Sequence, residues 1–194
     1  PGSSFKPIAY ATAMEVAGLT QATVLVDQPT VFKVPGQDDY KPGNHDNTFM
    51  GSMTVRKALN ISRNLPAIKA MEAATPEAVV ARATELGYQN MQPVWSLALG
   101  SVEVTPLQHA AAYGAFANGG VKMEPYFVAR IESANGLALF EATPRSTRIW
   151  SPEVAYEMLD TLHGNVVDEG AFSLRAAIDG RYVSGKTGTT NEER

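Results

Sequence analysis

Two short polar motifs, one at each end of the chain, contain the residue types that acyl-transfer chemistry needs. The first is a Ser-x-x-Lys motif at 3–6, and the second is Lys-Thr-Gly-Thr at 186–189. A serine at a helix start lies beside backbone N–H groups and a positive helix field, which together can stabilise an oxyanion. A lysine one turn later can act as the base if burial or a neighbouring cation lowers its pKa.

Taken singly, each motif also has an ordinary structural interpretation. Ser3 could simply cap a helix, although Lys6 stands where a capping box would place Glu or Gln. The segment 186–189 could be an edge strand, and a third candidate, Ser-Arg-Asn at 62–64, could cap a helix. Acyl transfer needs an oxygen nucleophile, a nearby base and paired N–H donors, and a helix start facing a strand provides all three.

The composition argues against several other classes of protein. At 194 residues and 44% apolar content, the chain is long enough for one domain with its own core. The net charge of -4 comes from dispersed residues without a Lys/Arg cluster, so nucleic acid is not an expected partner. Cysteine is absent, which excludes disulfides, thiolate metal sites and a cysteine nucleophile.

The remaining residues predict neither a metal nor a nucleotide cofactor. His45, His109 and His163 lack the spacing of metal-binding motifs, and we expect each to be structural or exposed. The glycines form no phosphate-binding fingerprint. No apolar run approaches the roughly 18 residues of a membrane-spanning helix.

Capping residues and apolar spacing predict the elements that position these motifs. Helices are expected over 3–17 (amphipathic, ended by Gly18), 54–60, 65–73, 76–86, 106–118 (buried and Ala-rich) and 152–163. Extended segments are expected over 24–34, on both sides of Asn135-Gly136 as a hairpin, and over 181–190 as a strand. The Pro-, Gly- and Asn-rich stretch 34–49 is expected to be a loop.

In their order along the chain, Ser-x-x-Lys, Ser-x-Asn and Lys-Thr-Gly resemble the motif set of penicillin-binding proteins and class A β-lactamases. The segments "PGSSFKP", "YKPGNHDNTFMGSMTVRKALNISRNLPAIKA", "LALGSVEVTPLQHAAAYGAFANGG" and "VSGKTGTTNEER" are similar to the transpeptidase domain of a class A, high-molecular-mass penicillin-binding protein. The similarity runs over 1–194 and is loosest over 141–180.

The resemblance implies a mixed α and β, penicillin-binding protein or serine β-lactamase-like transpeptidase fold, in which helices flank an antiparallel sheet. The domain of this family carries further sheet strands before the first motif and after the last. We therefore expect 1–194 to be a partial transpeptidase domain with sheet strands missing at both ends. On that basis the isolated chain is predicted to be poorly stable and weakly active.

The resemblance also implies roles for the motif residues. Ser3 would be the acylated nucleophile and Lys6 its proton acceptor, while Ser62 would relay protons. Asn64 would hold the backbone amide of the substrate. The oxyanion hole would be formed by the backbone N–H groups of Ser3 and Thr189.

The last motif would bind the end of the substrate. Lys186 would supply positive charge beside the serine of the second motif, and the hydroxyls of Thr187 and Thr189 would hold the terminal carboxylate of a D-Ala-D-Ala stem peptide. Gly188 would leave room for the substrate along the strand. We expect Arg63 to point to solvent, with a substrate contact as the alternative.

The function implied is a D,D-transpeptidase that cross-links peptidoglycan stem peptides through a serine acyl-enzyme and is acylated by β-lactam antibiotics. A D,D-carboxypeptidase or serine β-lactamase is the alternative, although the Glu-x-x-Leu-Asn segment of class A lactamases is absent between 64 and 186. A penicillin-sensing receptor domain or an inactive fragment is the alternative of another class. The implied location is extracytoplasmic, in the periplasm or on the outer face of the cytoplasmic membrane. Any membrane anchor would lie in other parts of the parent protein.

Overall fold

The computed structural model describes residues 1–189, so the end of the last motif segment, 190–194, lies outside the described residues. The helices are η1 (Gly2–Phe5), α1 (Lys6–Ala17), α2 (Val55–Asn60), α3 (Asn64–Ala74), α4 (Pro76–Glu85), η2 (Trp95–Leu99), α5 (Pro106–Ala117), α6 (Pro152–Val167) and η3 (Leu174–Ala176). The strands are β1 (Val24–Asp27), β2 (Gly51–Thr54), β3 (Val121–Met123), β4 (Arg130–Glu132), β5 (Ala138–Glu141) and β6 (Ser146–Arg148).

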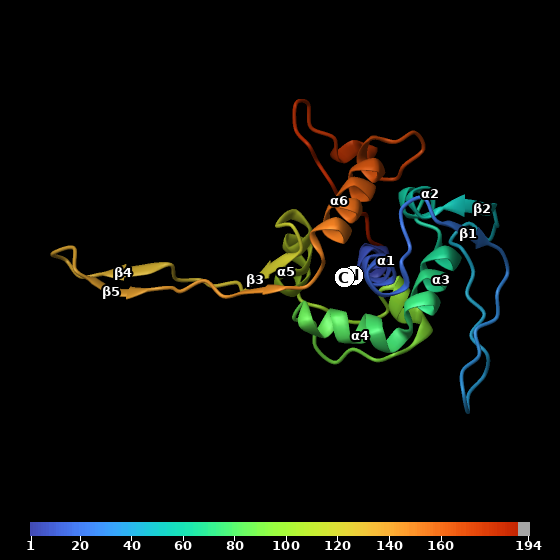
Figure 1. The fold of residues 1–194 in the computed structure, drawn as a ribbon, viewed down its shortest axis with the longest axis horizontal. Helices are drawn as coiled ribbons and strands as arrows, with labels where there is room; N and C mark the ends of the chain where they lie inside the picture. The colour runs from blue at the N-terminus through green and yellow to red at the C-terminus, as the bar shows by residue number, and fades with distance from the viewer. Residues whose placement is uncertain (190–194) are drawn as a thin grey trace.

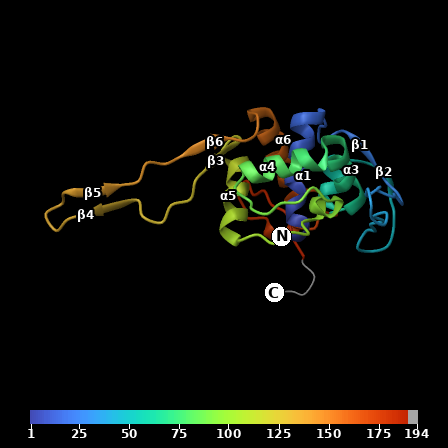
Figure 2. The same cartoon turned by 90° about the horizontal axis from the view of Figure 1, so that it is seen from below.

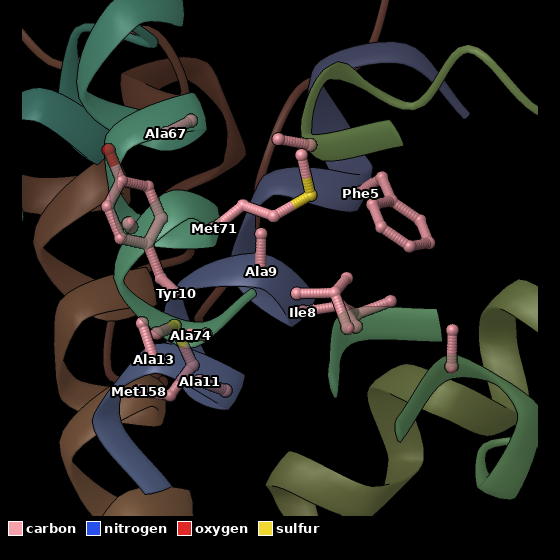
Figure 3. Packing of buried hydrophobic residues seen from close by; sticks show 14 of the residues in the cluster. Phe5, Ile8, Ala9, Tyr10, Ala11, Ala13, Ala67, Met71, Ala74 and Met158 are labelled. Atoms are coloured by element: carbon pink, nitrogen blue, oxygen red, sulfur yellow. The ribbon is translucent and has the colours of Figure 1, made fainter. Parts of the chain in front are cut away.

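Helix α1 occupies the centre of the molecule, and the other helices pack around it (Figure 1). Residues 6–14 are all buried, so α1 is not the amphipathic helix that the apolar spacing predicts. The difference arises because α3, α4 and α6 contact α1 from several sides, and a helix surrounded in this way buries its whole circumference. Figure 3 shows Ala9 of α1 beside Met71 of α3 and the side chain of Met158 near Ala11.

Local capping explains where several elements begin and end. Thr105 and Gln108 form a reciprocal capping box at the start of α5, as their spacing predicts. Gly18 ends α1 in the left-handed conformation, with φ of 67°. The prediction that the helix over 106–118 is buried is wrong. Helix α5 buries Ala112, Ala115 and Phe116 on one face and exposes Leu107, Ala110 and Gly114 to solvent.

In residues 1–189 the strands form three two-stranded antiparallel sheets, β1–β2, β3–β6 and β4–β5, rather than one continuous sheet. The β4–β5 pair is the hairpin predicted from Asn135-Gly136, and it projects away from the helical body (Figures 1 and 2). In the stretch 24–34, the only regular strand of the described residues is β1, which pairs with β2. Phe32 pairs with Tyr40 in an isolated bridge. The segment between β1 and β2 covers 28–50, so it contains the loop predicted over 34–49 and also most of the stretch predicted to be extended over 24–34.

The predicted strand over 181–190 is wrong for the described residues, because 181–189 form no β-ladder. Instead, α6 holds this segment through individual hydrogen bonds. Asn165 donates its side-chain amide to the Gly185 carbonyl at 2.7 Å, and the Gly185 N–H donates to Leu162 at 3.2 Å. Extended residues without a neighbouring strand are fixed here by a helix rather than by a sheet.

Gly100, just after η2, touches the turn that precedes α1. Its φ is 74°, and a Cβ built on it would lie 2.7 Å from the Gly2 nitrogen and 2.8 Å from the Gly2 carbonyl carbon. The Gly2 N–H also donates to the Gly100 carbonyl at 3.3 Å. Glycine is therefore required at position 100 both for its backbone conformation and for the approach of another backbone.

We predict that Gly100→Ala lowers the free energy of unfolding more than Gly18→Ala does. Both glycines have left-handed φ, so each substitution costs about 1–2 kcal/mol of backbone strain. A Cβ on Gly18 meets nothing within 4 Å, whereas one on Gly100 overlaps Gly2, which adds roughly 1–3 kcal/mol of overpacking. Urea unfolding of both variants measures the difference. Equal losses would contradict the contact.

Candidate active site

The two ends of the described chain meet, as the motifs predict. A Cβ on Gly2 would overlap the Thr189 carbonyl and lie 3.2 Å from the Thr189 nitrogen. A Cβ on Gly188 would overlap the Pro1 carbonyl and lie 3.0 Å from the Ser4 hydroxyl. In Figure 2 the red end of the described chain lies close to the N-terminal mark. Two glycines thus allow the 186–189 segment to lie against the start of the first helix.

Ser3 and Lys6 occupy consecutive turns at the start of the central helix. Ser3 lies in η1, and the Lys6 N–H donates to the Ser3 carbonyl. Side chains three residues apart in a 3₁₀ turn lie on the same side, so Ser3 and Lys6 face the same space. Ser3 is partly exposed, whereas Lys6 is fully buried.

The Lys6 amine is fixed by three oxygens of the Ser-x-Asn motif. Its Nζ lies 2.6 Å from the Ser62 carbonyl, 2.7 Å from Asn64 Oδ1 and 3.3 Å from Ser62 Oγ. Burial, together with the nearby charges of Lys186 and Arg63, lowers the pKa of Lys6 to about 6. Lys6 is therefore mainly neutral at pH 7, with two N–H bonds for its two shortest contacts and a lone pair left to accept a proton.

Lys186 approaches the same serine from the other end of the chain. Its Nζ donates to Ser62 Oγ at 2.8 Å and to the carbonyl of Thr187 at 3.1 Å. Burial lowers the pKa of Lys186 to about 8, so this amine remains mainly charged at pH 7. The Ser62 hydroxyl thus lies between a neutral amine and a charged one, which is an arrangement suited to proton relay.

A helix ending places Ser62 in this position. The Ser62 N–H donates to Leu59 at 3.0 Å and the Arg63 N–H donates to Ala58 at 2.9 Å, which together form a Schellman motif after α2. Ser62 occupies the left-handed position of that motif, with φ of 56°, where glycine is preferred. A non-glycine residue in this conformation costs about 1–2 kcal/mol, so the surroundings must hold Ser62 there.

The expectation that Arg63 points to solvent is wrong. Arg63 is 6% exposed, and its guanidinium contacts Asp27 and Asp46, each at 2.8 Å. It turns inward because these two carboxylates, brought close by β1 and the 34–49 loop, supply fixed acceptors for its N–H groups. Sequence spacing could not reveal this, since the two aspartates lie far from Arg63 along the chain.

Asn64 begins α3 and has a side chain with two protein partners. Its Oδ1 accepts from Lys6 at 2.7 Å, and its Nδ2 donates to the Gly43 carbonyl at 2.8 Å. An amide nitrogen carries two hydrogens, so one donor of Nδ2 remains for a substrate carbonyl. Thr187, Gly188 and Thr189 are exposed beside this site.

His109, which the sequence predicts to be structural or exposed, lies next to Ser4. The Ser4 hydroxyl donates to the Pro1 carbonyl at 2.7 Å, so its oxygen accepts from His109 Nε2, 2.9 Å away. His109 Nδ1 then accepts from the Tyr88 hydroxyl at 2.6 Å. Burial lowers the pKa of His109, in keeping with a neutral ring. This chain of hydrogen bonds tethers the turn that carries Ser3.

An open groove of about 590 Å³ lies at the same place. It is lined by His109, Ser4 and Lys186, among other residues.

Within 1–189, no three His, Cys, Asp or Glu side chains are grouped so that they could hold an ion. In the same residues, none of the helices has the length and hydropathy required to cross a bilayer. The groups brought together are hydroxyls, amines, an amide and backbone N–H donors.

Comparison with known proteins identifies the family. The family model of the penicillin binding protein transpeptidase domain matches residues 1–193. Penicillin-binding protein 1A of Aquifex aeolicus is 37% identical over 193 residues, which cover 99% of this chain and 26% of that protein. Penicillin-binding protein 1A of Pseudomonas aeruginosa is 41% identical over 147 residues, covering 74% of this chain and 18% of that protein.

Solved structures agree with this match. Penicillin-binding protein 1A of Haemophilus influenzae superposes with a TM-score of 0.89 at 32% identity, over 98% of this chain and 34% of that one. The D,D-transpeptidase domain of a peptidoglycan glycosyltransferase from Eggerthella lenta gives 0.80 at 27% identity, over 100% and 54%. The chain spans about a quarter of the Aquifex relative. It belongs, as its three motifs predict, to the penicillin-binding protein transpeptidase family, and the relatives named here are of the 1A type.

Proposed function

We propose that this chain is part of a D,D-transpeptidase domain that joins peptidoglycan stem peptides through an acyl-enzyme on Ser3. The observation that carries the proposal is the position of Ser62 Oγ between two amines, Lys6 at 3.3 Å and Lys186 at 2.8 Å. The different pKa values of these amines supply a base and a cation at the same pH. Membership of the family supports the reaction class.

The first half-reaction is acylation. Ser3 Oγ attacks the carbonyl carbon of the penultimate D-Ala, and its proton passes to the neutral Lys6 amine. The backbone N–H groups of Ser3 and Thr189 stabilise the oxyanion that develops on the carbonyl oxygen. As the C–N bond breaks, the terminal D-Ala leaves as an amine, which takes a proton relayed through Ser62.

The second half-reaction releases the enzyme. The amine of a second stem peptide attacks the ester carbonyl and loses a proton to the same relay. The bond from the carbonyl carbon to Ser3 Oγ then breaks, and the Ser3 oxygen takes that proton back from Lys6. During acylation, charged Lys186 and the hydroxyls of Thr187 and Thr189 bind the terminal carboxylate of the donor, which then departs with the released D-Ala. Asn64 binds the donor backbone in both half-reactions. A β-lactam mimics the donor and remains as an ester because its leaving group stays attached to the acyl part.

The proposal extends to the protein that contains this chain. As in the class A type that the motifs resemble, that protein would be anchored in the cytoplasmic membrane by other segments and would act on the outer side of it. Its substrates would be stem peptides ending in D-Ala-D-Ala, and β-lactams would be its covalent inhibitors.

We predict that a fluorescent penicillin labels the wild-type protein at Ser3 and that Ser3→Ala abolishes the label. Ser146→Ala is the control, since it removes an exposed hydroxyl in β6, outside the three motifs, and should label like the wild type. Gel fluorescence and mass spectrometry of the labelled peptide measure both outcomes. Equal labelling of wild type and Ser3→Ala would remove Ser3 from the mechanism.

The fate of the acyl group separates transpeptidation from its alternatives. With a D-Ala-D-Ala pentapeptide donor and an amine acceptor, we expect mass spectrometry to detect the cross-linked amide as the main product. A hydrolysed tetrapeptide would instead indicate a D,D-carboxypeptidase, and rapid release of bound penicillin would indicate a β-lactamase. A stable penicillin ester with no peptide turnover would indicate a sensing domain.

We predict a bell-shaped pH dependence for acylation, because the step needs neutral Lys6 and charged Lys186. The base is lost as pH falls through the Lys6 pKa of about 6, and the cation is lost as pH rises through the Lys186 pKa of about 8. Stopped-flow measurement of the acylation rate constant should therefore give a maximum near neutral pH. A rate that climbs steadily beyond pH 9 would exclude a role for the Lys186 charge.

A further inference from the structure

We propose that Arg63 is a positioning residue of the active site, acting through a clamp in which buried Arg63 and Asp27 are joined to the exposed residues Asp46 and Thr48. The clamp joins the Ser-x-Asn turn to β1 and to the loop before β2. It thereby fixes the oxygens that hold the Lys6 amine. The inference rests on the proposed function, since it assigns Arg63 a part in placing the proposed base.

The clamp has the geometry of a fixed guanidinium site. Arg63 Nε contacts Asp27 at 2.8 Å, Nη1 contacts Asp46 at 2.8 Å, and Nη2 donates to the Thr48 carbonyl. Asp27 is fully buried and also accepts from the Met50 N–H at 3.1 Å. Three different nitrogens of one planar group are therefore directed at three separate acceptors, which a lysine could not reproduce.

Asn44 connects the clamp directly to the catalytic motif. Its Nδ2 donates to Asp27 Oδ1 at 2.7 Å and to the Thr48 carbonyl at 2.9 Å, while its Oδ1 accepts from the Asn64 N–H at 2.8 Å. The neighbouring Gly43 carbonyl accepts from the Asn64 side chain. Both the backbone and the side chain of Asn64 are thus held by the loop that Arg63 secures.

The clamp also explains how Ser62 remains in a left-handed conformation. Arg63 follows Ser62 directly, and its side chain fixes the chain just after the strained residue, as Asn64 does one residue later. A buried ion pair often adds little net stability, because desolvation offsets the attraction. Its effect here is to specify one arrangement of the turn, in which Ser62 O and Asn64 Oδ1 both face Lys6.

The charge of Arg63 acts on Lys6 as well. Lys186 from the C-terminal segment and Arg63 from the turn are the cations that lower the pKa of Lys6 beyond the effect of burial. Asp27 and Asp46 face the same region, but each is paired with the Arg63 guanidinium. Removal of the guanidinium would therefore raise the pKa of Lys6 as well as release the turn.

Arg56 provides a matched control, because it also bridges two aspartates. Its Nη1 lies 2.8 Å from Asp160 and its Nε lies 2.7 Å from Asp168, but these contacts join α2 to α6 rather than to the Ser-x-Asn turn. We would compare Arg63→Met, Arg63→Lys and Arg56→Met in the intact protein that contains this chain. The measurements are the melting temperature, the penicillin acylation rate constant from pH 5 to 9, and amide exchange at Asn64.

Arg63→Met should lower the maximal acylation rate by about tenfold or more, because small displacements of reacting groups have effects of this size. The acid limb of the pH profile, where the rate rises as Lys6 loses its proton, should move to a higher pH by roughly half a unit or more. Exchange of the Asn64 backbone amide should become faster. Arg63→Lys should keep the acid limb near its wild-type position and still lose most of the rate. Arg56→Met should lower the melting temperature with the rate, the acid limb and the Asn64 exchange unchanged.

A wild-type rate and acid limb in folded Arg63→Met would overturn the inference, as would changes in Arg56→Met that match those in Arg63→Met. If Arg63→Met does not fold, Arg63→Lys decides the matter, and a wild-type rate in that variant would overturn the inference. The proposed function fails separately, when the wild-type protein takes no label at Ser3. The Asn64 exchange comparison does not depend on acylation, so it tests the clamp in that case too.

Discussion

The burial of one amine is the constraint on which the rest of this structure depends. Lys6 has no exposed surface, and the free energy of keeping a charge in that environment is what lowers its pKa to about 6. Such burial requires a helix that is covered on all sides, which α1 is over residues 6–14, because α3, α4 and α6 pack around it. The hydrophobic core and the proposed base are therefore parts of the same arrangement.

The residues of the site around Lys6 are held in place by different local contacts. The Ser-x-Asn oxygens depend on a left-handed helix ending and on the Arg63 clamp. Lys186 depends on hydrogen bonds from α6 to the segment before it, including Asn165 to Gly185. The Ser3 turn depends on close backbone contacts at Gly2, Gly100 and Gly188, where side chains would overlap the neighbouring chain.

The features that could be predicted from the sequence are those encoded locally. Caps such as Thr105, the end of α1 at Gly18 and the Asn135-Gly136 hairpin follow from short-range chemistry, and the ordered motifs predicted that the two ends meet. The inward orientation of Arg63 was not predictable, because its carboxylate partners are adjacent to it only after folding. The complete burial of residues 6–14 in α1 was also missed, because alanines are compatible with either a partly or a completely covered helix.

The two lysines illustrate how a single residue type can supply opposite functions. Lys6 and Lys186 both approach the Ser62 hydroxyl, but Lys6 is more deeply buried and is repelled by two cations, whereas burial alone lowers the pKa of Lys186. Between about pH 6 and 8, the first is mainly an acceptor and the second mainly a charged donor. Arg63 stays protonated throughout this range, so its contribution to the field at Lys6 is constant. Environment rather than residue identity therefore separates the proposed base from the proposed carboxylate-binding cation.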